Sequence, residues 1–195
     1  MVQRISHLCL LASFSTAPLL RADLDLTPGT ATRHLESFSF PELIFSDGSQ
    51  QVSYEFPHGW SYSVISSKQI RFNPPQLAQA QAEIEAVPLT EGFAFDEKSI
   101  KKLREETVRG LPKNSTQIQI LSEVTNALLI NGHKTYEVTI AYTCYGQRYR
   151  TSVLFANLDR QQLRCRVLAQ ASDFEKIHRT FSDTLCSLQW LKAGT

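Results

Sequence analysis

The chain has 195 residues, with 20 Lys and Arg against 19 Asp and Glu and a formal net charge of +1. That balance excludes the broad basic surface that attracts nucleic acids or anionic membranes, so any electrostatic recognition has to be local. The length is sufficient for one core that needs neither a metal nor disulfides, and a hydrophobic content of 42% excludes an intrinsically disordered chain.

The first 22 residues have the pattern of an export signal. Arg4 supplies a positive charge, an apolar run extends from Leu8 to Leu20, and Leu20-Arg21-Ala22 resembles a cleavage site. The run is too short, and too interrupted by Pro18, for a membrane-spanning helix of about 20 apolar residues. We therefore predict export to the periplasm or the extracellular space, with cleavage near Ala22 and no membrane span. Retention of this segment would instead make the protein cytosolic.

Cleavage would leave three cysteines, Cys144, Cys165 and Cys186, each 21 residues after the previous one. In an oxidising compartment this odd number allows at most one disulfide. The even spacing matches no zinc pattern, because structural zinc sites use closely spaced pairs of ligands. Buried thiols that pack as small apolar residues are the simpler interpretation, and we expect no metal and no cofactor.

Residues 23–47 contain turn-forming residues without a sustained hydrophobic period, which indicates a linker. An early strand can lie between Leu35 and Phe45. The remaining residues, 48–195, show no internal repeat and no second core, so they are predicted to form a single domain.

Alternating apolar residues from Gln51 lead into Pro57-His58-Gly59, and the alternation resumes at Trp60. Because Pro fixes φ and Gly permits positive φ, this pattern predicts two strands joined by a hairpin corner. Leu77 to Val87 alternates small apolar residues with Gln and Glu, which predicts a strand. Its content of Ala, Gln and Glu leaves a helix as the alternative.

Asp96 to Arg109 has the signals of a helix. Asp96 can cap the first turn, Phe95 and Ile100 occupy the positions of a hydrophobic staple, and Gly110 ends the segment. The outward face mixes Lys, Arg and Glu, so we expect a solvated face and not a binding patch.

The next predicted strand, Thr116 to Val124, should point Ile118, Ile120 and Ser122 inward. Asn131-Gly132 then marks a turn. A three-stranded meander follows, over Lys134–Cys144, Gln147–Ala156 and Gln162–Gln170.

A second helix is predicted to begin at the capping box Ser172-Asp173-Phe174-Glu175. Leu188 and Trp190 indicate a short closing strand. The apolar residues that share one face of this helix are Phe174, Ile177, Phe181 and Leu185.

In this order, the elements resemble the PsbP-like superfamily, which also holds the Ran-binding Mog protein of yeast and the periplasmic DcrB-type lipoproteins of bacteria. The resemblance covers roughly residues 48–191. It rests on Phe56-Pro57-His58-Gly59-Trp60, the capped helix at Asp96, Asn131-Gly132 before the meander, and the segment from Phe174 to Trp190. It implies an α+β fold with an antiparallel β-sheet flanked by helices, a PsbP-like α/β/α sandwich. It also implies a non-catalytic role in partner binding or assembly, and it transfers no functional residue because superfamily members do different jobs.

Arginines supply the strongest candidate binding site. Their guanidinium groups bind carboxylates and phosphates through paired hydrogen bonds, so a cluster could hold an anionic ligand, a lipid headgroup or an acidic partner. The alternative is an ordinary solvated face, paired in part with Glu137. Trp60 at the hairpin corner is a second candidate contact. If the last loop of the meander has three residues, one face of neighbouring strands carries Arg148, Arg150, Arg164 and Arg166.

Catalytic motifs are not apparent, since the sequence lacks Gly-x-Ser-x-Gly and a papain-like Cys context. No histidines form an i, i+4 pair that would suggest a zinc site, and we expect His58 in a turn and His178 on a helix flank. Glu83 and Glu85 share one side of their strand and are expected in solvent. The sequence therefore predicts neither a catalytic nor a metal site.

Three functional hypotheses follow. The first is an exported, non-enzymatic binding or assembly domain that contacts a protein partner or a small anionic ligand, and no nucleic acid, through the arginines or Trp60. The second is a carrier of a lipid or a small acid, which requires an apolar pocket with an arginine at its mouth. The third is an enzyme whose residues meet only in the fold, which requires a cleft that joins His58 or His133 to a buried carboxylate.

Overall fold

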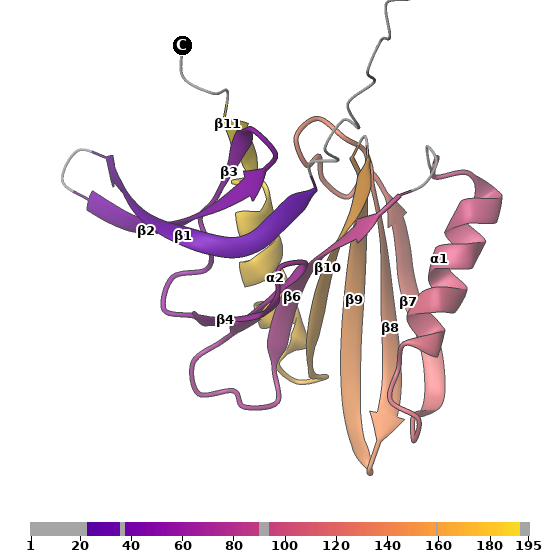
Figure 1. The fold of residues 1–195 in the computed structure, drawn as a ribbon. Helices are drawn as coiled ribbons and strands as arrows, with labels where there is room; N and C mark the ends of the chain where they lie inside the picture. The colour runs from indigo at the N-terminus through magenta and orange to yellow at the C-terminus, as the bar shows by residue number, and fades with distance from the viewer. Residues whose placement is uncertain (1–22, 36–37, 90–93, 159, 192–195) are drawn as a thin grey trace, which may run out of the picture.

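The computed structural model describes residues 23–35, 38–89, 94–158 and 160–191. The predicted export signal, residues 1–22, lies outside this part of the chain. Two antiparallel β-sheets and two helices make up the described fold, which confirms the predicted α+β class (Figure 1). No helix in these ranges is long and apolar enough to cross a membrane.

The larger sheet consists of β4 (Ser61–Ser66), β5 (Gln69–Asn73), β6 (Gln81–Pro88), β7 (Thr116–Thr125), β8 (Thr135–Cys144), β9 (Gln147–Asn157) and β10 (Gln161–Gln170). Their spatial order is β4-β5-β6-β10-β9-β8-β7. The predicted meander is confirmed as β8, β9 and β10, and Tyr145-Gly146 forms its first turn with positive φ at both residues. The alternating segment that ends near Pro88 is confirmed as a strand, not a helix.

The smaller sheet contains β1 (Leu24–Leu35), β2 (Phe38–Asp47), β3 (Gln50–Tyr54) and β11 (Gln189–Leu191), in the order β1-β2-β3-β11. The early strand expected between Leu35 and Phe45 corresponds to β2. The prediction that residues 23–47 form a linker is wrong, because β1 pairs with β2 and buries Leu24 and Leu26. The register of that pairing shifts between Asp25 and Gly29, so the segment shows no constant period in the sequence. The predicted closing strand is confirmed as β11.

The two helices cover opposite faces of the larger sheet (Figure 1). Helix α1 (Glu97–Arg109) packs on β8 and β9, where Leu103 joins a buried cluster with Tyr136 and Phe155. Helix α2 (Phe174–Leu185) lies against β9 and β10 on the other face. The main core is closed there by α2 together with the smaller sheet.

The helix starts follow the sequence signals only in part. Asp96 caps α1 as predicted, because its Oδ1 accepts a hydrogen bond from the backbone N–H of Ser99 at 2.8 Å. The predicted capping box of α2 is wrong. Asp173 is the N-cap residue without a side-chain cap, and the Ser172 hydroxyl donates to its carboxylate at 3.1 Å.

Strand β7 forms an open edge of the larger sheet, and all of its residues are exposed. The prediction that Ile118, Ile120 and Ser122 point inward is therefore wrong. The register between β7 and β8 shifts twice, once between Thr116 and Gln119 and once between Ile120 and Ser122. These shifts break the strict alternation that the prediction assumed.

Candidate functional site

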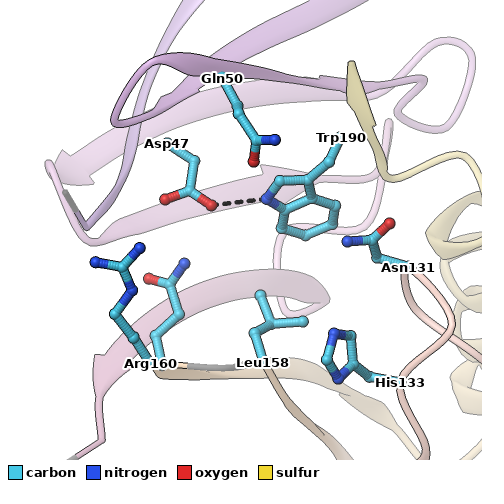
Figure 2. Close-up of a pocket in the computed structure, with 8 residues that line it drawn as sticks. Asp47, Gln50, Asn131, His133, Leu158, Arg160 and Trp190 are labelled. Carbon is cyan, nitrogen blue, oxygen red and sulfur yellow. Dashed lines mark hydrogen bonds between the residues drawn. The ribbon is translucent and has the colours of Figure 1, made fainter. Parts of the chain in front are cut away.

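A small polar pocket lies where the ends of the two sheets meet (Figure 2). The turn between β2 and β3, the turn before β8, the β9–β10 connection and strand β11 all contribute to it. Its volume is about 130 Å³. The residues that line this polar pocket are Asp47, Gln50, Asn131, His133, Leu158, Arg160, Gln161 and Trp190.

Tight turns shape two sides of the polar pocket. Asn131 and Gly132 have φ values of 49° and 77°, the positive pair that a type I′ turn requires. The backbone groups of Ile130 and His133 close this turn with hydrogen bonds of 3.2 and 2.9 Å. Gly48, with a φ of 63°, provides the bend between β2 and β3. The backbone therefore fixes where the side chains next to both turns emerge.

Hydrogen bonds hold three side chains of the polar pocket in place. The indole N–H of Trp190 donates to Oδ2 of Asp47 at 2.7 Å, so the smaller sheet presents both groups as one unit (Figure 2). Oε1 of Gln161 accepts from the backbone N–H of Leu24 at 3.2 Å. Leu158 is 8% exposed and adds an apolar wall.

The remaining polar side chains have no such anchor. Arg160, His133, Asn131 and Gln50 make no side-chain hydrogen bond or ion pair with the described residues. Arg160 and Asp47 line the same cavity without an ion pair between them. The polar pocket thus offers an unpaired guanidinium, an oriented carboxylate and several neutral donors and acceptors.

The four candidate arginines do not share a face, so that prediction is wrong. The ladder between β9 and β10 leaves residues 158–161 between its last paired positions, one more than a three-residue loop. A shift of one residue moves every side chain of a strand to the opposite face. Arg164 and Arg166 accordingly lie on the α1 side of the sheet, whereas Arg148 and Arg150 lie on the α2 side.

Two of these arginines already have partners. Arg164 binds Glu106 of α1 at 2.8 Å, and Arg150 binds Glu175 of α2 at 2.6 Å. Arg148 is exposed and has no side-chain partner among the described residues. The arginines therefore form separate local contacts, not one anion-binding surface.

Arg166 lines a hollow of about 170 Å³ under the C-terminal end of α1. Its guanidinium lies 3.7 Å from the position that a Cβ on Gly110 would take, at the helix end where the helix dipole favours a cation. An arginine beside a hollow is what the carrier hypothesis requires, but this volume is too small for a lipid and leaves room only for a small acid.

The prediction that Pro57-His58-Gly59 joins the two strands of a hairpin is wrong, because β3 and β4 belong to different sheets and do not pair. The turn between them contributes to the core instead. Trp60 is 8% exposed and stacks on Phe181 of α2, with ring centroids 6.3 Å apart. The prediction that Trp60 is a contact residue is therefore wrong, while His58 lies exposed in the turn as predicted. Glu83 is also buried, contrary to the expectation of solvent exposure, and its carboxylate binds Arg71 at 2.8 Å.

A half-buried polar cluster joins α2 to the larger sheet. Oε1 of Glu137 accepts a hydrogen bond from the Ser152 hydroxyl and contacts Nε2 of His178, both at 2.6 Å. Burial alone would raise the pKa of Glu137, but the hydrogen bonds from His178 and Ser152 outweigh it and lower that pKa. The same bond to Glu137 raises the pKa of His178 despite its burial. His178 lies half-buried on the flank of α2, as predicted, and is in addition a structural partner of the sheet.

This cluster lacks the geometry of a catalytic triad. The hydroxyl of Ser182 approaches Nε2 of His178 at 3.5 Å, and that is the nitrogen that already contacts Glu137. A triad needs its nucleophile and its carboxylate on different ring nitrogens. The arrangement therefore provides an ion pair without an activated serine.

The three described cysteines are free; Cys144 and Cys165 are buried, whereas Cys186 is exposed. The interpretation of buried thiols is confirmed for the first two. Burial raises the pKa of Cys165 to about 12, so its reactive thiolate is scarce near neutral pH. Across the described ranges, no group of three His, Cys, Asp or Glu side chains is placed to hold a metal.

Sequence reasoning identified little of the polar pocket. Asn131 was recognised only as a turn residue, and His133 only as a histidine that needed a carboxylate. Asp47 and Trp190 are 143 positions apart and meet through the pairing of β11 with β3. The sequence does show that polar residues are concentrated at turns. It does not show which of these turns lie close together in the fold.

No protein-family model matches the sequence, and no curated protein does. Solved structures match instead. Cyanobacterial PsbP (CyanoP) from Synechocystis sp. PCC 6803 has a TM-score of 0.54 and 10% identity, over 91% of this chain and 98% of that chain. LpqN, involved in cell envelope biogenesis of Mycobacterium tuberculosis, has a TM-score of 0.52 and 13% identity, over 82% and 88%.

A structure from Bacteroides thetaiotaomicron has a TM-score of 0.47 and 14% identity. The match covers 74% of this chain but only 46% of that chain. The similarities to CyanoP and LpqN have such low identity that they show the fold alone. They confirm the resemblance that the order of elements predicted. The chain has the PsbP-like α+β fold.

Proposed function

We propose that the chain is an exported, non-enzymatic binding domain that takes up a small charged ligand at the polar pocket. The supporting observation is the convergence of four polar side chains, Arg160 among them, that have no partner in the described residues. They face a cavity beside Asp47, whose carboxylate is oriented by Trp190. Polar groups that converge on a cavity and are not satisfied by the protein are available for a ligand.

Binding explains this geometry better than catalysis does. An enzyme whose residues meet only in the fold would need His58 or His133 hydrogen-bonded to a carboxylate that orients it. His58 lines a separate cavity with Glu55 and Asp183, but its side chain makes no hydrogen bond with the described residues. Asp47 instead accepts from Trp190 and makes no hydrogen bond with His133. The polar pocket therefore combines recognition groups without a general base in position.

Ligand-induced stabilisation tests this proposal. The unfolding midpoint is measured at rising concentrations of acetate, ethylamine or glycine, since a ligand at 100 times its Kd stabilises the folded state by about 2.7 kcal/mol. At least one compound should raise the midpoint of the wild type and of Arg148→Gln, but not that of Arg160→Gln. Arg148 is the matched control because it is equally unpaired and lies outside the polar pocket. Equal responses of the two variants, or no response to any compound, would contradict the proposal.

Export is tested by intact mass in separated cell fractions, combined with thiol alkylation. We expect a species that begins near Asp23 in the exported fraction. Native protein should be alkylated at Cys186 alone, because Cys144 and Cys165 are buried, and all three thiols should react after unfolding without reductant. A full-length cytosolic species would contradict export, and two thiols that stay unreactive after unfolding would reveal a disulfide.

The open edge of the larger sheet favours a second candidate function, assembly with a protein partner. Strand β7 has no neighbour on its outer side among the described strands, so an extended segment of a partner could add to the sheet there. Leu121→Lys should then reduce co-purification of that partner, while Lys98→Gln on the outer face of α1 should not. The apolar side chains of β7, between 39% and 44% exposed, are Ile118, Ile120, Leu121 and Val124.

A further inference from the structure

We infer that the ligand of the polar pocket is a free α-amino acid, held through its ammonium and carboxylate groups. This inference rests on the binding function proposed above and names the class of ligand. It follows from three properties of the polar pocket: the sign of its two charges, their lack of mutual neutralisation, and the size of the cavity.

The two charged side chains have opposite signs and stay unpaired. Arg160 makes no ion pair with the described residues. Asp47 accepts a hydrogen bond from the neutral indole of Trp190 and makes no ion pair either. A simple anion attracted by Arg160 would be repelled by Asp47, and a simple cation attracted by Asp47 would be repelled by Arg160. A ligand that carries both charges satisfies both side chains at once.

The donor and acceptor geometry suits this ligand. A guanidinium binds a carboxylate with two parallel N–H donors, and Arg160 has all of its donors available. Oδ2 of Asp47 is occupied by Trp190, which leaves Oδ1 for an ammonium donor. The two groups reach the cavity from different sheets, so the ligand would bridge them (Figure 2).

The cavity sets the size of the group that it can enclose. At about 30 Å³ for each water-sized group, 130 Å³ has room for about four of them. That is the size of the head of an amino acid, with Leu158 and the ring of Trp190 beside its apolar carbon. The side chain of the ligand would extend past Asn131 and Gln50, both exposed, into solvent. We therefore expect weak selectivity among amino acids with small side chains.

Calorimetric titration of the mature chain with glycine, acetate and ethylamine tests the requirement for both charges. Glycine should bind at least tenfold more tightly than acetate, which carries only the negative charge, and than ethylamine, which carries only the positive one. Alanine and serine should match glycine within a few fold, because their side chains leave the cavity.

Two charge-removing variants complete the test. Asp47→Asn keeps an oxygen that can accept from Trp190, and it should weaken glycine binding at least tenfold without weakening acetate binding. Arg160→Gln should weaken both, whereas Arg148→Gln should weaken neither. If acetate binds the wild type as tightly as glycine, or Asp47→Asn leaves glycine binding unchanged, the amino-acid inference is wrong while the proposed binding function stands. If none of the compounds binds, both are wrong.

Discussion

The polar pocket and the half-buried cluster of Glu137, Ser152 and His178 contain the same kinds of side chain, but their polar groups are unpaired in the pocket and paired in the cluster. In the cluster, one carboxylate oxygen contacts both of its neighbours at 2.6 Å. In the polar pocket, Arg160 and His133 have no partner in the described part of the chain. A polar group that has a hydrogen-bond partner within the protein therefore stabilises the fold, whereas a group of the same type without such a partner is free to bind a ligand.

Removal of a satisfied group should have the largest effect. Glu137→Ala leaves Ser152 unpartnered and His178 with only the 3.5 Å contact to Ser182 in a half-buried site, so we expect the free energy of unfolding to fall by about 2–3 kcal/mol. Arg160→Ala should change it by less than about 0.5 kcal/mol, because that side chain is exposed and unpaired. Urea unfolding measures both values. Similar losses in the two variants would remove the distinction between the two regions.

The pH dependence of stability sharpens the same distinction. The lowered pKa of Glu137 means that its contribution is present above its ordinary value of 4.5 and is lost as the pH falls through the folded value. The raised pKa of His178 means that its contribution is present below its ordinary value of 6.5 and is lost as the pH rises through the folded value. The stability difference between wild type and Glu137→Ala should therefore be largest between pH 4.5 and 6.5 and decline on both sides. A difference that does not vary with pH would show that the pair is not ionised as described.

A smaller difference in stability is expected between variants of Arg164 and Arg148, two of the arginines that the sequence placed on one face. Arg164 binds Glu106 at 2.8 Å and lies over the ring of Phe155, so Arg164→Ala should cost about 1 kcal/mol. Arg148→Ala should stay within about 0.5 kcal/mol of wild type, because the side chain is exposed and without a partner. Equal costs in thermal unfolding would indicate that the two arginines share an environment after all.

Much of the fold could be predicted because it depends on local patterns. Alternation identified β6 and the meander, and Asp96 with Gly110 marked both ends of α1. Strand β1 was missed because a shift in its register removes the period on which such predictions depend. Strand β7 was identified, but its exposure at the sheet edge depends on strand order, which no local pattern encodes.

The candidate site could not be predicted for related reasons. The faces of Arg164 and Arg148 depended on whether the ladder between β9 and β10 leaves three or four residues unpaired at the loop, and alternation within each strand is equally consistent with both. The polar pocket depends on pairing between β3 and β11, which brings Trp190 to Asp47 from the far end of the chain. The sequence predicts the turn at Asn131, but it does not predict which residues lie next to that turn in the fold.

The two tryptophans allow the most direct test of binding at the polar pocket. Trp190 lines the cavity, whereas Trp60 is stacked on Phe181 in the core, so their indole N–H signals in a nitrogen-15 NMR spectrum report on the site and on an internal control. We predict that glycine shifts the Trp190 signal in a saturable way and leaves the Trp60 signal in place. A Trp190 signal that does not respond to glycine, acetate or ethylamine, or that moves only together with that of Trp60, would contradict binding at the polar pocket.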